Sequence, residues 1–417
     1  MKSLTRFLNG HVVPPLTALS ENTYLSAIRA GMVSIVPLTI IGGLFMVVSF
    51  LPVKGWDERV APYLQLLQIP VTATFGLLAV FVCFGIGYDF GKRLKQEAIV
   101  SASMATLVFL MIQIRLDDQS LTMDGLGSKG LFTAILVALV CVRVQKFFTD
   151  RNWVIKLPPN VPAIVYETFL SLVPMLFLMT AFWLIRFVLG VDINHLLQTA
   201  FKPLVFALNT LPGILVFAFL VTLLWSVGIN GDNTLDAIVG PIFLGYLAAN
   251  VQAASQGQPL PYVTALGFFT SFVNVGGTGA TIGLALVMLN SKDPSYRKIS
   301  RVSLPTQVFG INEPIFFGFP IVLNPIFMIP YVLNALILTT GSFLLMDWGV
   351  IQKPFVCVPW TTPPVIGHYL VTGGDWKAAV WGAMSLLIAM AVYYPFARAA
   401  ERQRSQPRDS ETRSLQP

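Results

Sequence analysis

Long runs of apolar residues, each followed by a short polar loop, recur along the whole 417-residue chain. Each run approaches the roughly 20 residues that a helix needs to cross a bilayer. A membrane β-barrel would instead show alternating residues in segments of about ten, and soluble domains carry roughly 25% charged residues against 11% here. We therefore predict an all-α polytopic membrane protein with about ten transmembrane helices. The expected spans are 31–51, 71–89, 98–114, 131–148, 163–189, 203–229, 235–251, 262–290, 326–346 and 378–397.

Basic residues gather in alternate loops, which accounts for the net charge of +7 without a nucleic-acid partner. The positive-inside rule assigns such loops to the cytoplasm. Both termini are therefore expected in the cytoplasm and Gly190 outside, and the first 30 residues lack the apolar core of a cleavable signal. The basic clusters are Lys92, Arg93 and Lys95; Arg143, Lys146, Arg151 and Lys156; Lys292, Arg297, Lys298 and Arg301; and Arg398, Arg402, Arg404, Arg408 and Arg413.

One polar segment divides the chain. Residues 147–162 alternate charges, aromatics and prolines and are too polar to span, so they form either a loop or an amphipathic linker on the membrane surface. This predicts an N-terminal membrane domain (1–160) and a C-terminal domain (161–400), with the fifth span assignable to either. Residues 401–417 are expected to be a disordered cytoplasmic tail. Three cysteines in apolar surroundings show no disulfide or metal spacing, and no cofactor or metal is expected.

The stretch from Ser303 to Tyr331 is strongly apolar yet contains five prolines, and each proline opposes a continuous helix. Within a membrane, interrupted backbone occurs only where protein or a water-filled cavity surrounds it. Glu313 is the only charged residue or histidine between Arg301 and Asp347. An intramembrane carboxylate at such a break marks a functional site, although it could also be a structural group that caps a broken helix.

Two other apolar stretches are interrupted in the same way, at Thr222–Asp236 and at the glycine-rich Asn274–Gly283. Unwound helices with amide and carboxylate groups are how transporters build substrate sites at membrane depth. Such a mixture of donors and acceptors suits an uncharged ligand rich in hydroxyl groups, such as a sugar. The candidate substrate-binding residues are Trp225, Asn230, Gly231, Asp232, Asn274, Gly276, Gly277, Thr278, Gly279, Asn312 and Glu313.

Structural roles remain open for several of these residues. The glycines could permit close helix packing, and Asn230 or Asp232 could cap a helix that starts near Thr234. Trp225, like other aromatic residues of this region, could pack in the core and need not stack on a ligand.

At these motifs the sequence resembles a known family. NEPIFFGFPIVLNPIFMIP (312–330), GGTGATIGLAL (276–286), LPPNVPAIVYETFLSLVP (157–174) and YRKISRVSLP (296–305) are similar to blocks of the membrane subunit IIC (EIIC) of the bacterial phosphoenolpyruvate-dependent sugar phosphotransferase system. The resemblance is to the lactose/cellobiose/N,N′-diacetylchitobiose branch and covers nearly the whole chain.

The resemblance implies a sugar permease in the bacterial cell membrane, with re-entrant hairpins and surface amphipathic helices added to the spans. It implies a homodimer formed through the N-terminal spans and an elevator-like movement of the C-terminal half. The permease itself is not an enzyme: a phosphocysteine of a separate EIIB partner phosphorylates the 6-hydroxyl of a bound disaccharide. Glu313 would hydrogen-bond that hydroxyl, and the glycine-rich segment would line the pocket.

One departure from the family is visible. Gly-Ile-Asn-Gly at Gly228–Gly231 stands where family members usually have Gly-Ile-His-Gly. An asparagine can position a hydroxyl but cannot take its proton near neutral pH, as a histidine could. Two other functions therefore stay open: an uncoupled sugar facilitator or exporter of the same fold, and a membrane sensor that binds sugar without moving it.

Overall fold

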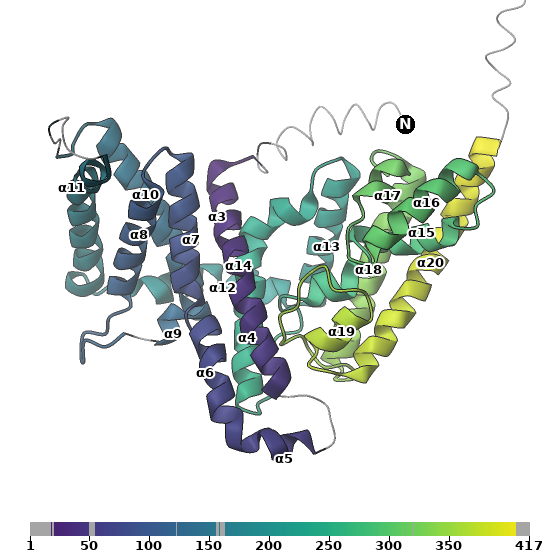
Figure 1. Ribbon diagram of the computed structural model, residues 1–417, viewed down its shortest axis with the longest axis horizontal. Coiled ribbons are helices and arrows are strands. Elements are labelled where there is room, and N and C mark those ends of the chain that lie inside the picture. Colours follow the sequence, from purple (N-terminus) through teal and green to yellow (C-terminus); the bar gives the residue numbers. More distant parts are fainter. Residues whose placement is uncertain are drawn as a thin grey trace, which may run out of the picture.

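The computed structural model describes residues 18, 21–49, 55–121, 123–155, 158, 163–319 and 321–405. These residues form helices joined by loops, with one isolated antiparallel bridge between Ile114 and Leu121. The helices run mostly in one direction or its opposite, with the earlier helices at one side of the molecule and the later ones at the other (Figure 1). The all-helical prediction is confirmed.

The first half is a set of regular helices. α7 packs against α3, α8 and α10, and α4 packs against α6. The helices of this half are α3 (Thr23–Ser34), α4 (Val36–Ser49), α5 (Trp56–Val60), α6 (Leu64–Phe75), α7 (Leu78–Arg93), α8 (Ala98–Ile112), α9 (Met123–Leu126), α10 (Leu131–Asp150) and α11 (Ala163–Trp183), which a π-helix extends over Leu184–Val188.

Small residues let these helices approach closely. A Cβ atom on Gly31 of α3 would lie 2.3 Å from Ile86 Cγ1 of α7, and one on Gly87 would lie 2.9 Å from the Cα of Ala102 of α8. Close packing of this kind is how helices associate in a bilayer, where lipid is as apolar as the side chains. Glycine therefore sets the spacing of α3, α7 and α8.

The second half is interrupted repeatedly. α12 and α13 meet at an angle of 84°, and the segment 268–288 is bent by 50° where a π-helix (Phe268–Val273) and a 3₁₀ turn (Thr278–Ala280) precede α15. The helices of this half are α12 (Ile193–Leu208), α13 (Leu211–Ser226), α14 (Gly231–Ser255), α15 (Ile282–Met288), α16 (Pro294–Gln307), α17 (Glu313–Gly318), α18 (Pro325–Asp347), α19 (Ile366–Val371) and α20 (Trp376–Ser405).

Seven helices of the described residues are long and apolar enough to cross a membrane, or nine if each bent pair is one span. The remaining expected span is α8, which is apolar but has only 15 residues. Boundaries moved most at the first two spans, because helix α3 already begins at Thr23 and the second span reaches back to Glu58. The stretch expected at 203–229 is not one straight helix but the bent pair α12–α13.

Three details of the prediction are corrected. The linker does not begin at Phe147, since α10 continues to Asp150, and residues 156–157 and 159–162 of the linker lie outside the described residues. The tail does not begin at 401 either, because α20 continues to Ser405; residues 406–417 are likewise not described. Two of the five prolines, Pro305 and Pro330, lie inside α16 and α18 and do not end them.

Candidate functional site

The first turn of α14 carries a carboxylate that joins three elements of the second half. Asp232 Oδ2 accepts hydrogen bonds from Trp225 Nε1 of α13 at 2.8 Å and from Thr278 Oγ1 at 2.9 Å. Its other oxygen, Oδ1, accepts from Asn274 Nδ2 at 3.2 Å. Since both Asn274 and Thr278 belong to the glycine-rich loop (residues 274–281), Asp232 holds this loop against the break between α13 and α14.

The glycine-rich loop also contacts the break between α16 and α17. Asn312, just before α17, is 5% exposed and donates from Nδ2 to the Thr278 carbonyl and to Thr281 Oγ1, both at 3.0 Å. Gly277 lies directly against Asn312, because a Cβ there would be 2.4 Å from Asn312 Cβ. The fold thus brings together three interruptions that are far apart in the sequence.

The residues that start α14 have local partners. Asn230 is its N-cap and accepts from the Asn233 backbone N–H at 2.9 Å, as asparagine commonly does at this position. A Cβ on Gly231 would lie 2.2 Å from the Val221 carbonyl oxygen, so the helix start is pressed against α13. Trp225 is 9% exposed and packs edge to face on Phe316 of α17, with ring centroids 5.1 Å apart. These contacts order the site.

Two predicted residues keep unused polar atoms. Glu313 is the first residue of α17, its side chain is exposed, and its carboxylate has no hydrogen-bond or ion-pair partner among the described residues. Asn274 Oδ1 is buried and also lacks a partner within the described part of the chain. The expectation of a carboxylate enclosed by protein differs from this exposed position, which leaves Glu313 open to a ligand.

A pocket beside Asn274 contains residues that the sequence analysis did not select. Its lining includes Thr270, Ser271 and Asn274, Gly310 ahead of α17, and Trp360 and Thr362. Trp360 is 58% exposed, and a Cβ on Gly310 would lie 3.2 Å from its carbonyl oxygen. The sequence held a signal for this segment, since Pro359, Pro363 and Pro364 interrupt it as prolines interrupt the 303–331 stretch.

The arrangement favours a neutral ligand that both donates and accepts hydrogen bonds. Hydroxyl and amide groups line a pocket with an exposed aromatic ring, and no group of three or more His, Cys, Asp or Glu among the described residues is placed to hold a metal ion. Asp232, Thr278 and the Asn312 amide nitrogen are engaged with protein, and the unpaired Asn274 oxygen is buried, whereas the exposed Glu313 can contact a ligand.

A polytopic helical membrane protein whose polar site is formed by interrupted helices has the architecture of a transporter. The chain matches the family model "Phosphotransferase system, EIIC" over residues 29–335. It is therefore a member of the EIIC family, in the lactose/cellobiose/diacetylchitobiose branch, and is the transport component of such a system.

Individual relatives agree over the full length. The chain is 33% identical to the putative permease IIC component YwbA of Bacillus subtilis, with 97% of each chain covered. It is equally identical to the cellobiose-specific EIIC component of Geobacillus stearothermophilus, covering 97% of this chain and 96% of that one. The crystal structure of ChbC, the IIC component of the N,N′-diacetylchitobiose-specific system, superposes with a TM-score of 0.90 at 30% identity, covering 95% of this chain and 98% of that chain.

Proposed function

We propose that this permease binds a disaccharide of the cellobiose, chitobiose or lactose type and presents its 6-hydroxyl to a separate EIIB protein. The substrate class is supported by the names of the relatives, which include cellobiose-specific and diacetylchitobiose-specific components. It is also supported by the uncharged, hydroxyl- and amide-bearing lining of the pocket beside Trp360, which at about 10 Å³ has to widen to admit a sugar. An exposed indole face suits the apolar face of a sugar ring.

The observation that carries this proposal is the open carboxylate of Glu313 beside the glycine-rich loop. The carboxylate accepts a hydrogen bond from the sugar hydroxyl and so orients the hydroxyl oxygen toward the incoming phosphorus. That oxygen forms the new bond while the sulfur–phosphorus bond of the EIIB phosphocysteine breaks. The sulfur keeps the bonding electrons, and the hydroxyl proton is released to solvent.

The other candidate residues act in two ways in this proposal. Asn274 contributes its unpaired oxygen to the pocket, together with the backbone of Gly276. Asp232, Thr278 and Asn312 position the loop through the bonds described above. Trp225 fixes the carboxylate of Asp232. Gly277 and Gly279 allow close approach, to Asn312 and to the Tyr331 ring respectively.

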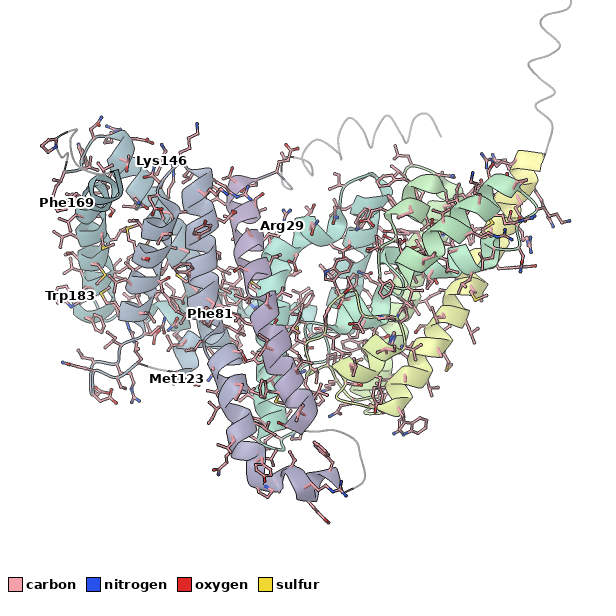
Figure 2. The ribbon with its side chains drawn as sticks, viewed as in Figure 1. Arg29, Phe81, Met123, Lys146, Phe169 and Trp183 are labelled. Carbon is pink, nitrogen blue, oxygen red and sulfur yellow. The ribbon has the colours of Figure 1, made fainter. Side chains whose placement is uncertain are left out.

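Our proposals for the dimer interface, the transport movement and the membrane topology are those that membership of the family implies. The N-terminal half forms a homodimer interface in the bilayer, and the C-terminal half carries the sugar across by an elevator movement. Both termini and the basic loops face the cytoplasm. In support, Lys146 and the C-terminal end of α20 both lie along the upper edge of the molecule in this view, whereas Met123 and Trp183 lie lower (Figures 1 and 2).

Asn230 supports a second candidate, an uncoupled sugar facilitator or exporter. Its side-chain oxygen already caps α14, and an asparagine cannot accept the hydroxyl proton near neutral pH. A sensor without transport is the remaining rival.

The test is uptake of labelled cellobiose, diacetylchitobiose and lactose into liposomes that contain the purified protein, with and without phosphorylated EIIB. Accumulation of sugar phosphate only with phosphorylated EIIB is the expected result. Equilibrating flux of free sugar that is indifferent to EIIB would instead establish a facilitator. Binding without flux would establish a sensor.

A further inference from the structure

The turn between α15 and α16 lies beside the C-terminal end of α20 and forms a strongly basic surface with it. Figure 1 shows α16 next to the yellow end of α20, and Arg404 of α20 forms an ion pair with Asp293 just before α16. Seven cations and only two carboxylates, Asp293 and Glu401, occupy these segments. The basic surface is defined by Lys292, Arg297, Lys298, Arg301, Arg398, Arg402 and Arg404.

Both carboxylates are used to order this surface. Glu401 accepts from Arg398 Nη1 at 2.7 Å, from the Lys292 backbone N–H at 3.0 Å and from the Ser291 hydroxyl. Asp293 accepts from Arg404 Nη1 at 3.2 Å, and the Arg404 guanidinium lies 4.6 Å from the centre of the Tyr296 ring. Arg297 donates to the Ser291 carbonyl through both Nε (2.9 Å) and Nη2 (2.6 Å).

α16 presents two further cations on its exposed face. Lys298 and Arg301 are exposed, while Ser300 and Ser303 on the opposite face are buried. α16 leads directly to Asn312 and Glu313. At about 1.5 Å per helical residue and at most about 3.5 Å per extended residue, Arg301 is within about 30 Å of Glu313. A globular domain of about 100 residues is about that wide.

We propose that the basic surface is the docking site for phosphorylated EIIB, which from there reaches the sugar held by Glu313. This inference rests on the proposed function. The phosphoryl group to be transferred is an anion, so cations along its approach attract the phosphorylated partner and steer its docking. Cations already fixed in place also reduce the entropy lost when a protein binds.

The rival occupant is an anionic lipid surface, since basic residues near a membrane bind headgroups as well. Headgroup binding needs only mobile cations. The paired carboxylates, the cation–ring contact and the doubly bonded Arg297 give this surface a fixed geometry, which favours a protein partner.

The test compares Lys298→Glu/Arg301→Glu with Lys92→Glu/Lys95→Glu. In the control pair, Lys92 lies in the last turn of α7 and Lys95 in the turn that follows, and both are exposed and expected in the cytoplasm. Sugar phosphorylation is measured in nonionic detergent against the concentration of phosphorylated EIIB, and sugar affinity is measured separately without EIIB. If charge reversal prevents folding, the double variant Lys298→Ala/Arg301→Ala is used in its place.

We expect the α16 variant to raise the half-saturating EIIB concentration about tenfold or more, with unchanged sugar affinity. The difference should shrink near 1 M salt, where the screening length is about 3 Å. If the α16 variant leaves the half-saturating EIIB concentration unchanged, or if the control pair shows the defect instead, the docking site is wrong but the proposed function stands. A defect seen only in vesicles containing phosphatidylglycerol would show a lipid surface. If the wild-type chain binds sugar but the bound sugar never accepts phosphate from EIIB, the proposed function is overturned as well.

Discussion

Glycine serves different purposes in the two halves of this molecule. In α3 and α7 the glycines at the helix contacts have no positive φ angle and simply make room, as at Gly31 and Gly87. In the glycine-rich loop they have positive φ angles, +67° at Gly276, +105° at Gly277 and +70° at Gly279. Glycine packs helices in the first half, and the second half uses it both for packing, as at Gly283, and to interrupt helices in the glycine-rich loop.

The two halves also differ in how many of their buried polar groups lack a hydrogen-bond partner. In the described residues of the first half, Ser101 of α8 donates to Gln145 of α10 at 2.6 Å, and Thr133 is one buried hydroxyl without a partner. The second half has many more buried side-chain atoms without a protein partner. They belong to Asn274, Ser300, Ser303, Gln307, Tyr331, Asn334, Thr339 and His368.

An unpaired buried polar group costs about 1–3 kcal/mol, so this difference has a physical meaning. The first half is organised as a stable support. The second half carries polar atoms whose partners must be water, substrate or another arrangement of the same helices, as expected if this half binds and moves a sugar as we propose.

The largest effect is expected from Gly277→Ala. The dihedral angles at Gly277 (φ 105°, ψ 167°) belong almost only to glycine, and a Cβ would also collide with Asn312. We expect sugar binding to fall below detection in equilibrium binding with purified protein. Gly31→Ala is the matched control: it should lower the melting temperature by disturbing α3 and α7 and leave the sugar affinity of the folded fraction unchanged. If the two changes reduced sugar binding equally, the difference that we draw between the two halves would be wrong.

The next effect is expected from Glu313→Gln. Hydrogen bonds to charged groups contribute about 1.5–3 kcal/mol, so uptake and phosphorylation should fall roughly 10- to 100-fold with expression unchanged. Asp347→Asn, an exposed carboxylate at the end of α18, should behave as wild type. Normal binding and uptake in Glu313→Gln would show that the site lies elsewhere.

A smaller loss is expected from Asp232→Asn. One of its two acceptor oxygens becomes an amide group, which cannot accept from Trp225, Thr278 or Asn274. Sugar affinity should weaken about tenfold because the loop is held less firmly, which corresponds to about 1.4 kcal/mol. A titration calorimetry series with both variants and the double variant Asp232→Asn/Glu313→Gln would show whether the two act together. Strict additivity would contradict a shared site.

The sequence predicted the helices and the three interruptions well, because apolar runs, prolines and glycine clusters are local signals. It also led to Glu313 and the glycine-rich loop. It could not separate residues that contact a ligand from residues that position them, because the partners of Asp232 lie 7, 42 and 46 residues away. Trp360 was missed for the same reason: only the folded chain brings it beside Gly310 and Asn274.

The smallest effect concerns two buried serines, one in each half. Ser101→Ala leaves Gln145 Oε1 without its donor, so it should destabilise the protein by about 1–3 kcal/mol. Ser303→Ala removes a buried hydroxyl that has no protein partner, so thermal unfolding in detergent should show no loss or a slight gain. Neither change should alter sugar affinity by more than about twofold if each effect stays within its own half. Destabilisation by Ser303→Ala would mean that the hydroxyl binds water or contacts another element, and the second half would then be as fully paired as the first.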